Sequence, residues 1–226
     1  MTAGARHDGP LPALFLALAF TTGMLDATSF LDLGSVFVAA MTGNVVILGL
    51  GLAGYGASLS PAVSLACFAA GAGCAGLLAR SALRPVHRGL RFAAGIAVQG
   101  VLVGVVAAVT TRHGFAGPWP RDAVVGGLAF SLGWQYATVR GLRVSDVNTT
   151  VVTTTLTSLF AESVAPARQG RRLLSICALL AGACSSGLLR RAVDPTAPLW
   201  TATALIAACV VAALAASVRR DSLRWR

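Results

Sequence analysis

The sequence has few charged residues and contains no lysine at all. Of its 226 residues, 12% are charged and 56% belong to the hydrophobic class, and the mean hydropathy is +0.75. This composition lies outside the usual range of soluble domains and excludes a soluble, disordered or fibrous protein. All 18 basic residues are arginines, and the formal net charge is +10. We derive no function from the absence of lysine.

Motifs of enzymes, metal sites and cofactor sites are also missing. The five cysteines form no CxxC pair and have no histidine nearby in the sequence, which excludes the usual zinc and thioredoxin-like patterns. There is no HExxH, no GxSxG and no phosphate-binding loop. We therefore expect a protein that is not an enzyme and that has no cofactor and no metal. Without an ATP-binding motif, any transport would be secondary, channel-like or powered by a separate partner.

The positive charge does not indicate a nucleic-acid partner. The arginines occur in short runs between apolar windows, where basic residues orient helices in a membrane. We expect the lipid bilayer as a partner and no binding to nucleic acid.

Eight apolar windows follow one another along the chain, each long enough to cross a hydrocarbon core of ~30 Å. They span residues 11–30, 35–58, 61–79, 92–110, 123–139, 147–165, 172–189 and 197–218. The pattern predicts an all-α polytopic membrane protein.

The two halves of the chain resemble each other when shifted by about 110 positions. The shift places Gly23, Ala27, Thr28, Cys67, Cys74 and Arg80 on Gly133, Ala137, Thr138, Cys177, Cys184 and Arg190. It predicts one integral membrane domain, with a first repeat over 11–110, a linker over 111–122 and a second repeat over 123–218. An N-terminal tail over 1–10 and a basic C-terminal tail over 219–226 flank the domain.

The arginine distribution bears on how many windows cross. If all eight windows cross, the arginines divide 10 to 8 between the two sides. If windows 35–58 and 147–165 enter and leave on the same side, they divide 14 to 4. The positive-inside rule favours the second arrangement, with both termini cytoplasmic and two inverted repeats of three transmembrane helices, each with a re-entrant element. Eight full spans in two parallel repeats of four remain the alternative, because window 35–58 ends in a very apolar run.

Those same two windows carry polar residues. The residues are Thr42, Gly43 and Asn44 in the first window and Asn148, Thr149, Thr150, Thr153 and Thr154 in the second. Non-helical backbone at membrane depth is tolerated only where protein or a watery cavity surrounds it. We expect the first cluster to act as the N-cap of a helix that begins near Val45, and the two tips to meet near the midplane. The alternative is that these side chains only join helices by hydrogen bonds.

Asp26 is the one acid deep in an apolar window, where an ionised carboxylate costs about 2.5–3.5 kcal/mol if it is central. One interpretation is a relay for protons or cations, and the other is a hydrated carboxylate near the interface. Tyr136 is its equivalent in the second half, beside Gln135, which we add to the candidate pathway residues.

Small residues spaced four apart predict close helix packing, within the chain or between protomers of a homo-oligomer. Gly100 and Gly104 form such a pair in window 92–110, and Ala69 and Gly73 form one in window 61–79. In the same window as the glycine pair, Gln99 is expected to make a packing hydrogen bond.

Three stretches together resemble the YoaK-like family of small bacterial integral membrane proteins. They are residues 23–27 (GMLDA), residues 37–44 (FVAAMTGN) and residues 147–150 (VNTT). The resemblance covers about residues 11–218 and implies a bacterial inner-membrane location and about six spans, but no substrate or reaction. The chain departs from the pattern at Thr153 and Thr154, where a second Thr-Gly pair is expected.

The sequence therefore predicts a membrane transporter or channel-like protein for a small polar or anionic solute. Its site would lie at the midplane between the two re-entrant elements. The alternative is a non-transporting membrane scaffold or assembly partner, in which the same polar residues only hold helices together.

Overall fold

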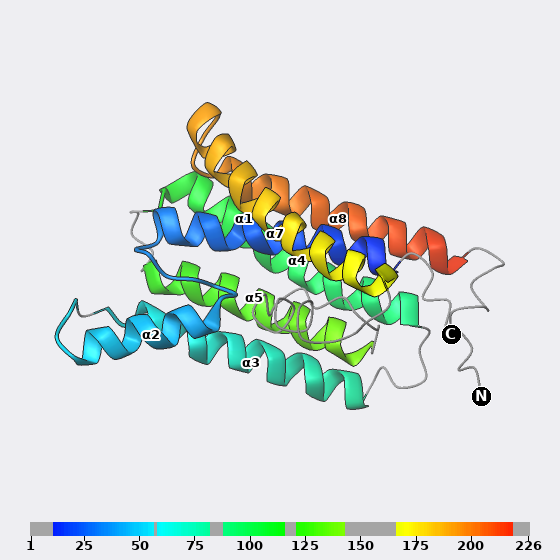
Figure 1. The fold of residues 1–226 in the computed structure, drawn as a ribbon, viewed down its shortest axis with the longest axis horizontal. Helices are drawn as coiled ribbons and strands as arrows, with labels where there is room; N and C mark the ends of the chain where they lie inside the picture. Colours follow the sequence, from blue (N-terminus) through cyan, green and yellow to red (C-terminus); the bar gives the residue numbers. More distant parts are fainter. Residues whose placement is uncertain (1–10, 57, 82–87, 116–120, 143–165, 219–226) are drawn as a thin grey trace.

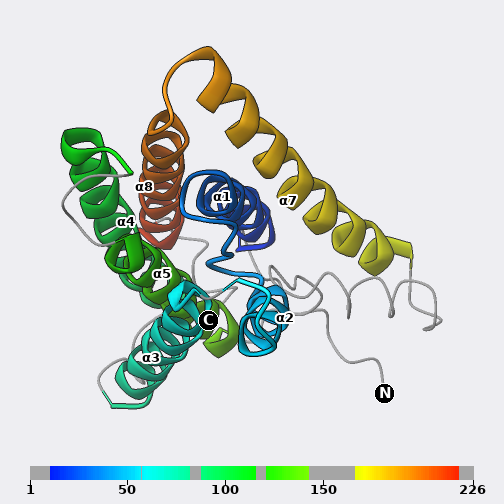
Figure 2. The same ribbon diagram turned by 90° about the vertical axis from the view of Figure 1, so that its left-hand side faces the viewer.

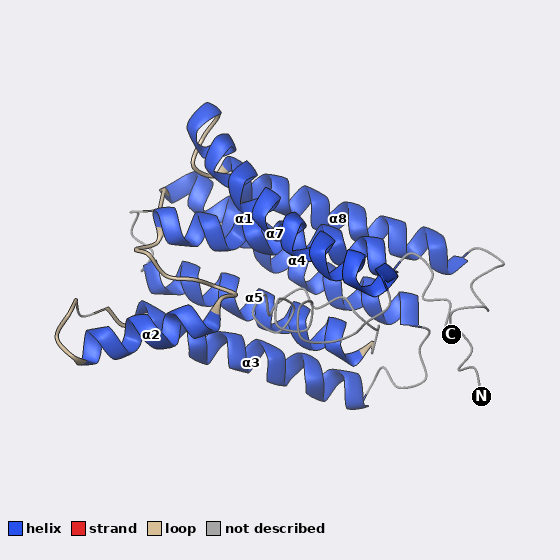
Figure 3. Ribbon diagram, viewed as in Figure 1, coloured by secondary structure: helices blue, strands red, loops and turns tan. Residues whose placement is uncertain are grey.

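The computed structural model describes residues 11–56, 58–81, 88–115, 121–142 and 166–218. Within these ranges every regular element is a helix and there is no strand (Figure 3). The helices are α1 (Leu11–Asp32), α2 (Met41–Leu52), α3 (Ser60–Ser81), α4 (Arg88–His113), α5 (Arg121–Gly141), α7 (Pro166–Ala192) and α8 (Ala197–Val218). The predicted all-α fold is confirmed, whereas the predicted element at 147–165 lies outside the described residues.

Five of the described helices are long and apolar enough to cross a membrane, namely α1, α3, α4, α7 and α8. With 21 residues α5 is also long enough, but its most apolar stretch is less apolar than those of the five, and it carries Gln135 in its buried face. The remaining helix, α2, has only 12 residues and extends about 18 Å. Residues 33–40, which precede α2, are not helical. Window 35–58 therefore does not form one continuous helix.

The long helices alternate in direction along the chain (Figure 1). We call the end where α1 begins and α8 ends the basal end, which is on the right in Figure 1, and the opposite end the apical end. From α1 the chain reaches the apical end, returns through residues 33–40 to the interior, and leaves again along α2 to the apical end, where α3 begins. We call residues 33–59 the hairpin and residues 36–40 its tip.

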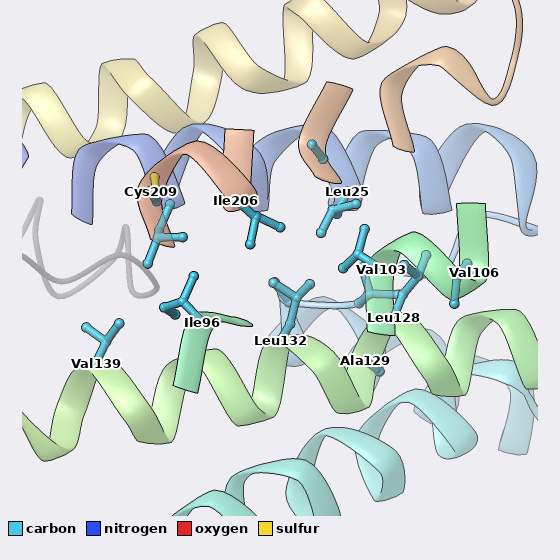
Figure 4. Close-up of a cluster of buried hydrophobic side chains, with 14 of the residues drawn as sticks. Leu25, Ile96, Val103, Val106, Leu128, Ala129, Leu132, Val139, Ile206 and Cys209 are labelled. Carbon is cyan, nitrogen blue, oxygen red and sulfur yellow. The ribbon is translucent and has the colours of Figure 1, made fainter. Parts of the chain in front are cut away.

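A core of buried aliphatic side chains joins four helices, α1, α4, α5 and α8 (Figure 4). Leu25 from α1, Val103 from α4, Leu132 from α5 and Ile206 from α8 are among its members. The helices differ in how much of their most apolar stretch is buried. In α1, 61% of these residues are buried, whereas in α3 and in α7 only 17% are. This is the pattern of a bundle whose outer helices present leucine and valine to lipid or to a neighbouring protomer.

Three helix pairs make the main contacts, α1 with α7, α3 with α5 and α4 with α8. Figure 2 shows α1 between α7 and α8, with α3 at the far edge of the bundle beside α5. In the first pair, glycines allow very close approach. A Cβ added at Gly23 would lie 2.1 Å from the carbonyl oxygen of Leu179, and one at Gly182 would lie 2.0 Å from that of Phe20. Only glycine fits at these two crossings.

The pair of α3 and α5 has the same kind of crossing. A Cβ added at Gly133 would lie 2.0 Å from the carbonyl oxygen of Phe68, and one at Gly71 would lie 2.1 Å from that of Phe130. By contrast Gly73, which the spacing of small residues predicted as a packing position, faces open space within the chain.

The pair of α4 and α8 uses the predicted glycine motif. Added Cβ atoms at Gly100 and Gly104 would lie 3.1 Å and 3.3 Å from side-chain methyl groups of Ile206 and Thr203. The motif therefore serves packing within one chain.

Candidate functional site

Asp26 holds the tip of the hairpin. Its carboxylate oxygen Oδ1 accepts hydrogen bonds from the backbone N–H groups of Val38, at 2.8 Å, and Ala39, at 2.7 Å. Val38 and Ala39 are both buried. The sequence left two interpretations of Asp26 open, a relay and a hydrated carboxylate, and the geometry adds a third role. The carboxylate replaces the hydrogen-bond partners that a non-helical backbone lacks inside a bundle.

Asn44 binds the same segment from the other side. Its side chain is fully buried, and its Oδ1 accepts a hydrogen bond from the N–H of Phe37 at 3.0 Å. Its Nδ2 donates to the carbonyl oxygen of Phe37 at 2.6 Å and to Ser64 Oγ at 3.0 Å. The Ser64 hydroxyl also donates to the carbonyl of Phe37 at 2.7 Å. The asparagine amide thus pairs with both polar groups of one residue, as a neighbouring strand would.

A fourth side chain completes the support of the tip. Ser29, buried on α1, donates a hydrogen bond to the carbonyl oxygen of Val36 at 2.8 Å. Side chains from α1, α2 and α3 therefore bind five backbone polar groups of residues 36–39, namely the carbonyls of Val36 and Phe37 and the N–H groups of Phe37, Val38 and Ala39. This makes the segment compatible with membrane depth, where each unpaired backbone group costs several kcal/mol.

The predicted N-cap is wrong. The helix α2 begins at Met41 rather than near Val45, its N-cap residue is Ala40, and no side chain caps it. Asn44 therefore lies inside the first turn of α2 and not before it. Its side chain binds the backbone of Phe37 and not the free N–H groups at the start of the helix. The Thr42 hydroxyl is exposed at the start of α2 and has no hydrogen-bond partner in the part of the chain that the structure describes.

Gly43 has a packing role that its sequence pattern does not reveal. A Cβ at this position would lie 2.9 Å from the ring of Phe37, which itself stacks on Phe30 with ring centroids 5.0 Å apart. The glycine makes room for the aromatic ring that the tip carries.

Gln135 belongs to a separate polar network at the centre of the bundle. Gln99 on α4 donates from Nε2 to Gln135 Oε1 at 2.5 Å, and Gln135 Nε2 donates to Thr22 Oγ1 on α1 at 3.2 Å. All three side chains are fully buried, and Gln99 Oε1 has no hydrogen-bond partner. The predicted packing hydrogen bond of Gln99 is confirmed.

The structure divides the candidate residues into three groups. Asp26 and Asn44 meet at the tip, with Thr42 and Gly43 beside it, whereas Gln135 lies in the central network. Five candidates lie outside the described residues, namely Asn148, Thr149, Thr150, Thr153 and Thr154. Sequence reasoning missed Ser29, Ser64 and Thr22, whose only signal was a hydroxyl in an apolar helix. In the described part of the chain, no group of three or more His, Cys, Asp or Glu side chains could hold a metal ion.

Comparisons with known proteins place the chain among membrane proteins of unknown function. Residues 14–212 match the family described as "Protein of unknown function (DUF1275)". The chain is similar to the UPF0700 transmembrane protein YoaK of Bacillus subtilis (strain 168), with 29% identity over 167 residues, 72% of this chain and 69% of that protein. No solved structure matches the chain.

Proposed function

The chain belongs to the DUF1275 family and is a multi-pass membrane protein, and from this premise we propose that it carries a small polar or anionic solute across the bacterial inner membrane. The resemblance to YoaK-like proteins inferred from three short stretches is confirmed. The hairpin is the observation that carries the proposal, and the solute pathway passes its tip.

The length and direction of α2 support a re-entrant hairpin. A helix of about 18 Å cannot cross a hydrocarbon core of ~30 Å. In addition, α1 ends and α3 begins at the apical end, so the segment between them enters and leaves on one side (Figure 1). These two features favour six crossings over eight. In transporters with discontinuous helices, such half-helices form the substrate site near the midplane.

The helix contacts support two inverted repeats. In this arrangement α1, α3 and α4 are equivalent to α5, α7 and α8, and equivalent helices run in opposite directions (Figure 1). Exchanging the two repeats turns the contact of α1 with α7 into the contact of α5 with α3, and both contacts are present. The same exchange leaves the contact of α4 with α8 unchanged.

The glycine crossings refine the register of these repeats. Gly23 of α1 and Gly133 of α5 occupy equivalent positions in the two crossings and are 110 residues apart in the sequence, as expected. Gly71 of α3 and Gly182 of α7 are also equivalent, but they are 111 residues apart. In this alignment the cysteines of α3 and α7 are one residue out of register.

The arginines support an orientation with the basal end in the cytoplasm. More of the arginines of the described helices lie in basal turns than in apical turns. The basal ones are Arg80, Arg88, Arg91, Arg140, Arg168, Arg171 and Arg172, and the apical ones are Arg112, Arg121, Arg190 and Arg191. The two ends of the chain would then lie in the cytoplasm, and the hairpin would enter from the outside.

The chemistry around the tip suits a small polar or anionic solute. The exposed Thr42 hydroxyl offers a free donor, and the N-terminal end of α2 contributes a partial positive charge at the tip. Protonation of Asp26 would remove the negative charge that binds the N–H groups of Val38 and Ala39. Binding of a proton at Asp26 would therefore favour detachment of the hairpin tip from α1.

Proteoliposome flux tests the proposal. Stopped-flow swelling is measured with formate, nitrate, urea and glycerol as probes, against liposomes without protein. We expect accelerated entry of at least one probe, and a decrease of about 2–10-fold in Thr42→Val, which removes one neutral hydrogen bond. The matched control is Thr203→Val on α8, whose hydroxyl donates only within its own helix, to Leu199.

Two outcomes would contradict a solute pathway. One is equal flux in the Thr42→Val protein and the wild-type protein. The other is no flux of any probe together with an altered oligomeric state in Asn44→Leu, which is the result expected of the scaffold alternative.

A further inference from the structure

A cavity of about 130 Å³ lies between α3, α4 and α5, at their basal ends and away from the hairpin. We call it the basal groove. Its lining includes Ala75 and Ala79 from α3, Arg91 and Ala94 from α4, and Trp134 from α5. Its volume is close to that of engineered apolar cavities that hold a benzene molecule, so it accommodates a short apolar segment.

The groove has a defined floor. A Cβ at Gly95 would lie 2.4 Å from the Thr138 methyl group, which shows how closely α4 approaches α5 there. The Trp134 indole N–H donates to the carbonyl oxygen of Gly95 at 2.9 Å, which fixes the ring across this contact. The alanines of α3 and α4 leave the space above the ring unfilled.

The groove opens to the outer surface of the bundle. Ala94 and Val98 line it and are exposed on α4, on a face that lipid covers in a membrane protein. Its occupant therefore reaches it from the bilayer. Further along α4, the exposed side chains of Val101 and Val105 extend this apolar surface.

One cationic group stands in this apolar lining. Arg91 lines the groove and is half-buried, and no hydrogen bond or ion pair joins it to another residue that the structure describes. Arg80 and Arg140 are exposed at the same end of the bundle. The acids of the described helices and loops, Asp26, Asp32, Asp122 and Asp194, do not lie at this end. Among the described residues no acid therefore neutralises Arg91, which leaves its guanidinium available to an anion.

We propose that the basal groove binds a phospholipid with an anionic headgroup, with the phosphate on Arg91 and the upper part of one acyl chain over Trp134. The guanidinium matches a phosphate in charge and geometry, and the apolar lining matches the chain. This site is independent of the solute pathway, because it shares no residue with the hairpin. The orientation with the basal end in the cytoplasm places it in the inner leaflet.

Lipid retention by the purified full-length protein tests the site. Native mass spectrometry is run with dioleoylphosphatidylglycerol and dioleoylphosphatidylcholine, which differ in headgroup charge but not in acyl chains. We expect retention of phosphatidylglycerol, reduced about tenfold in Arg91→Gln and partly restored in Arg91→Lys. The matched control, Arg80→Gln, removes an exposed arginine from the same end and should keep wild-type retention.

Further variants separate the chain from the headgroup. Ala94→Phe fills the groove and should reduce retention of phosphatidylglycerol while Arg91 is intact, and Val98→Phe serves the same purpose if the first variant does not fold. Equal retention in Arg91→Gln and Arg80→Gln would overturn the proposal. So would full competition by inorganic phosphate, which would indicate a site for a free anion, or a change of oligomeric state in Ala94→Phe, which would indicate an interface between protomers.

Discussion

Replacing Asp26 by leucine should release the tip of the hairpin while the helices stay folded. A hydrogen bond to a charged group contributes about 1.5–3 kcal/mol, so the two bonds to Val38 and Ala39 hold the tip by about 3–6 kcal/mol. Because removing this half-buried carboxylate also saves about 2.5–3.5 kcal/mol, the overall stability should fall by only about 0.5–2.5 kcal/mol. The large effect is therefore expected locally, at the tip.

The assay is thiol labelling of a single cysteine at Ala39, which is buried in the wild-type protein. In an otherwise cysteine-free protein, Asp26→Leu should raise the labelling rate about a hundredfold or more. Asp26→Asn keeps an acceptor oxygen, and its weaker neutral bonds of about 0.5–1.5 kcal/mol each should give an intermediate rate. Equal rates in all three proteins would refute the role assigned to the carboxylate.

Three further predictions concern the bundle, and thermal unfolding in detergent checks each. Gly133→Leu should cost about 1–3 kcal/mol or more, because the added side chain meets backbone of α3, whereas Gly73→Leu in open space should change stability by less than about 0.5 kcal/mol. Gln135→Leu should cost about 1–3 kcal/mol, since it removes two hydrogen bonds of the central network, and an unchanged melting temperature would contradict the network. Arg190→Gln should lower the melting temperature more than Asp32→Asn does, because the Asp32 side chain is only 6% exposed and would be left unpaired, and the reverse order would count against the pair.

Hydropathy was sufficient to predict the long helices. The windows 11–30, 61–79 and 197–218 correspond to α1 (Leu11–Asp32), α3 (Ser60–Ser81) and α8 (Ala197–Val218). Such predictions succeed because a membrane-spanning helix satisfies its own backbone, so that its apolar run alone defines it.

The local structure of the hairpin was less predictable. A cluster of Thr, Gly and Asn before an apolar run is typical of an N-cap, but the Asn44 side chain binds Phe37, seven residues earlier, and Ser64, twenty residues later. The choice between these partners depends on how α1 and α3 fold against the hairpin, which no local pattern contains.

The central network could be predicted only in part. A lone glutamine in an apolar helix predicts a hydrogen bond to another helix, and Gln99 makes one. Its partner, Gln135, was a candidate for a different reason, because it stands beside the residue equivalent to Asp26. Neither glutamine indicates which helices meet at the centre of the bundle. That depends on how α1, α4, α5 and α8 pack together.

The most direct test of the inverted repeats is to determine on which side of the membrane the two ends of the hairpin lie. Single cysteines at Tyr55, His113 and Arg80, in an otherwise cysteine-free protein, are probed in intact cells with a membrane-impermeant thiol reagent. With a re-entrant hairpin, the cysteines at positions 55 and 113, at the apical end, should be labelled in intact cells, and the cysteine at position 80 only after the cells are permeabilised. Labelling of Arg80 in intact cells with protection of Tyr55 would mean that the hairpin crosses the membrane, and would contradict both the inverted repeats and a re-entrant pathway.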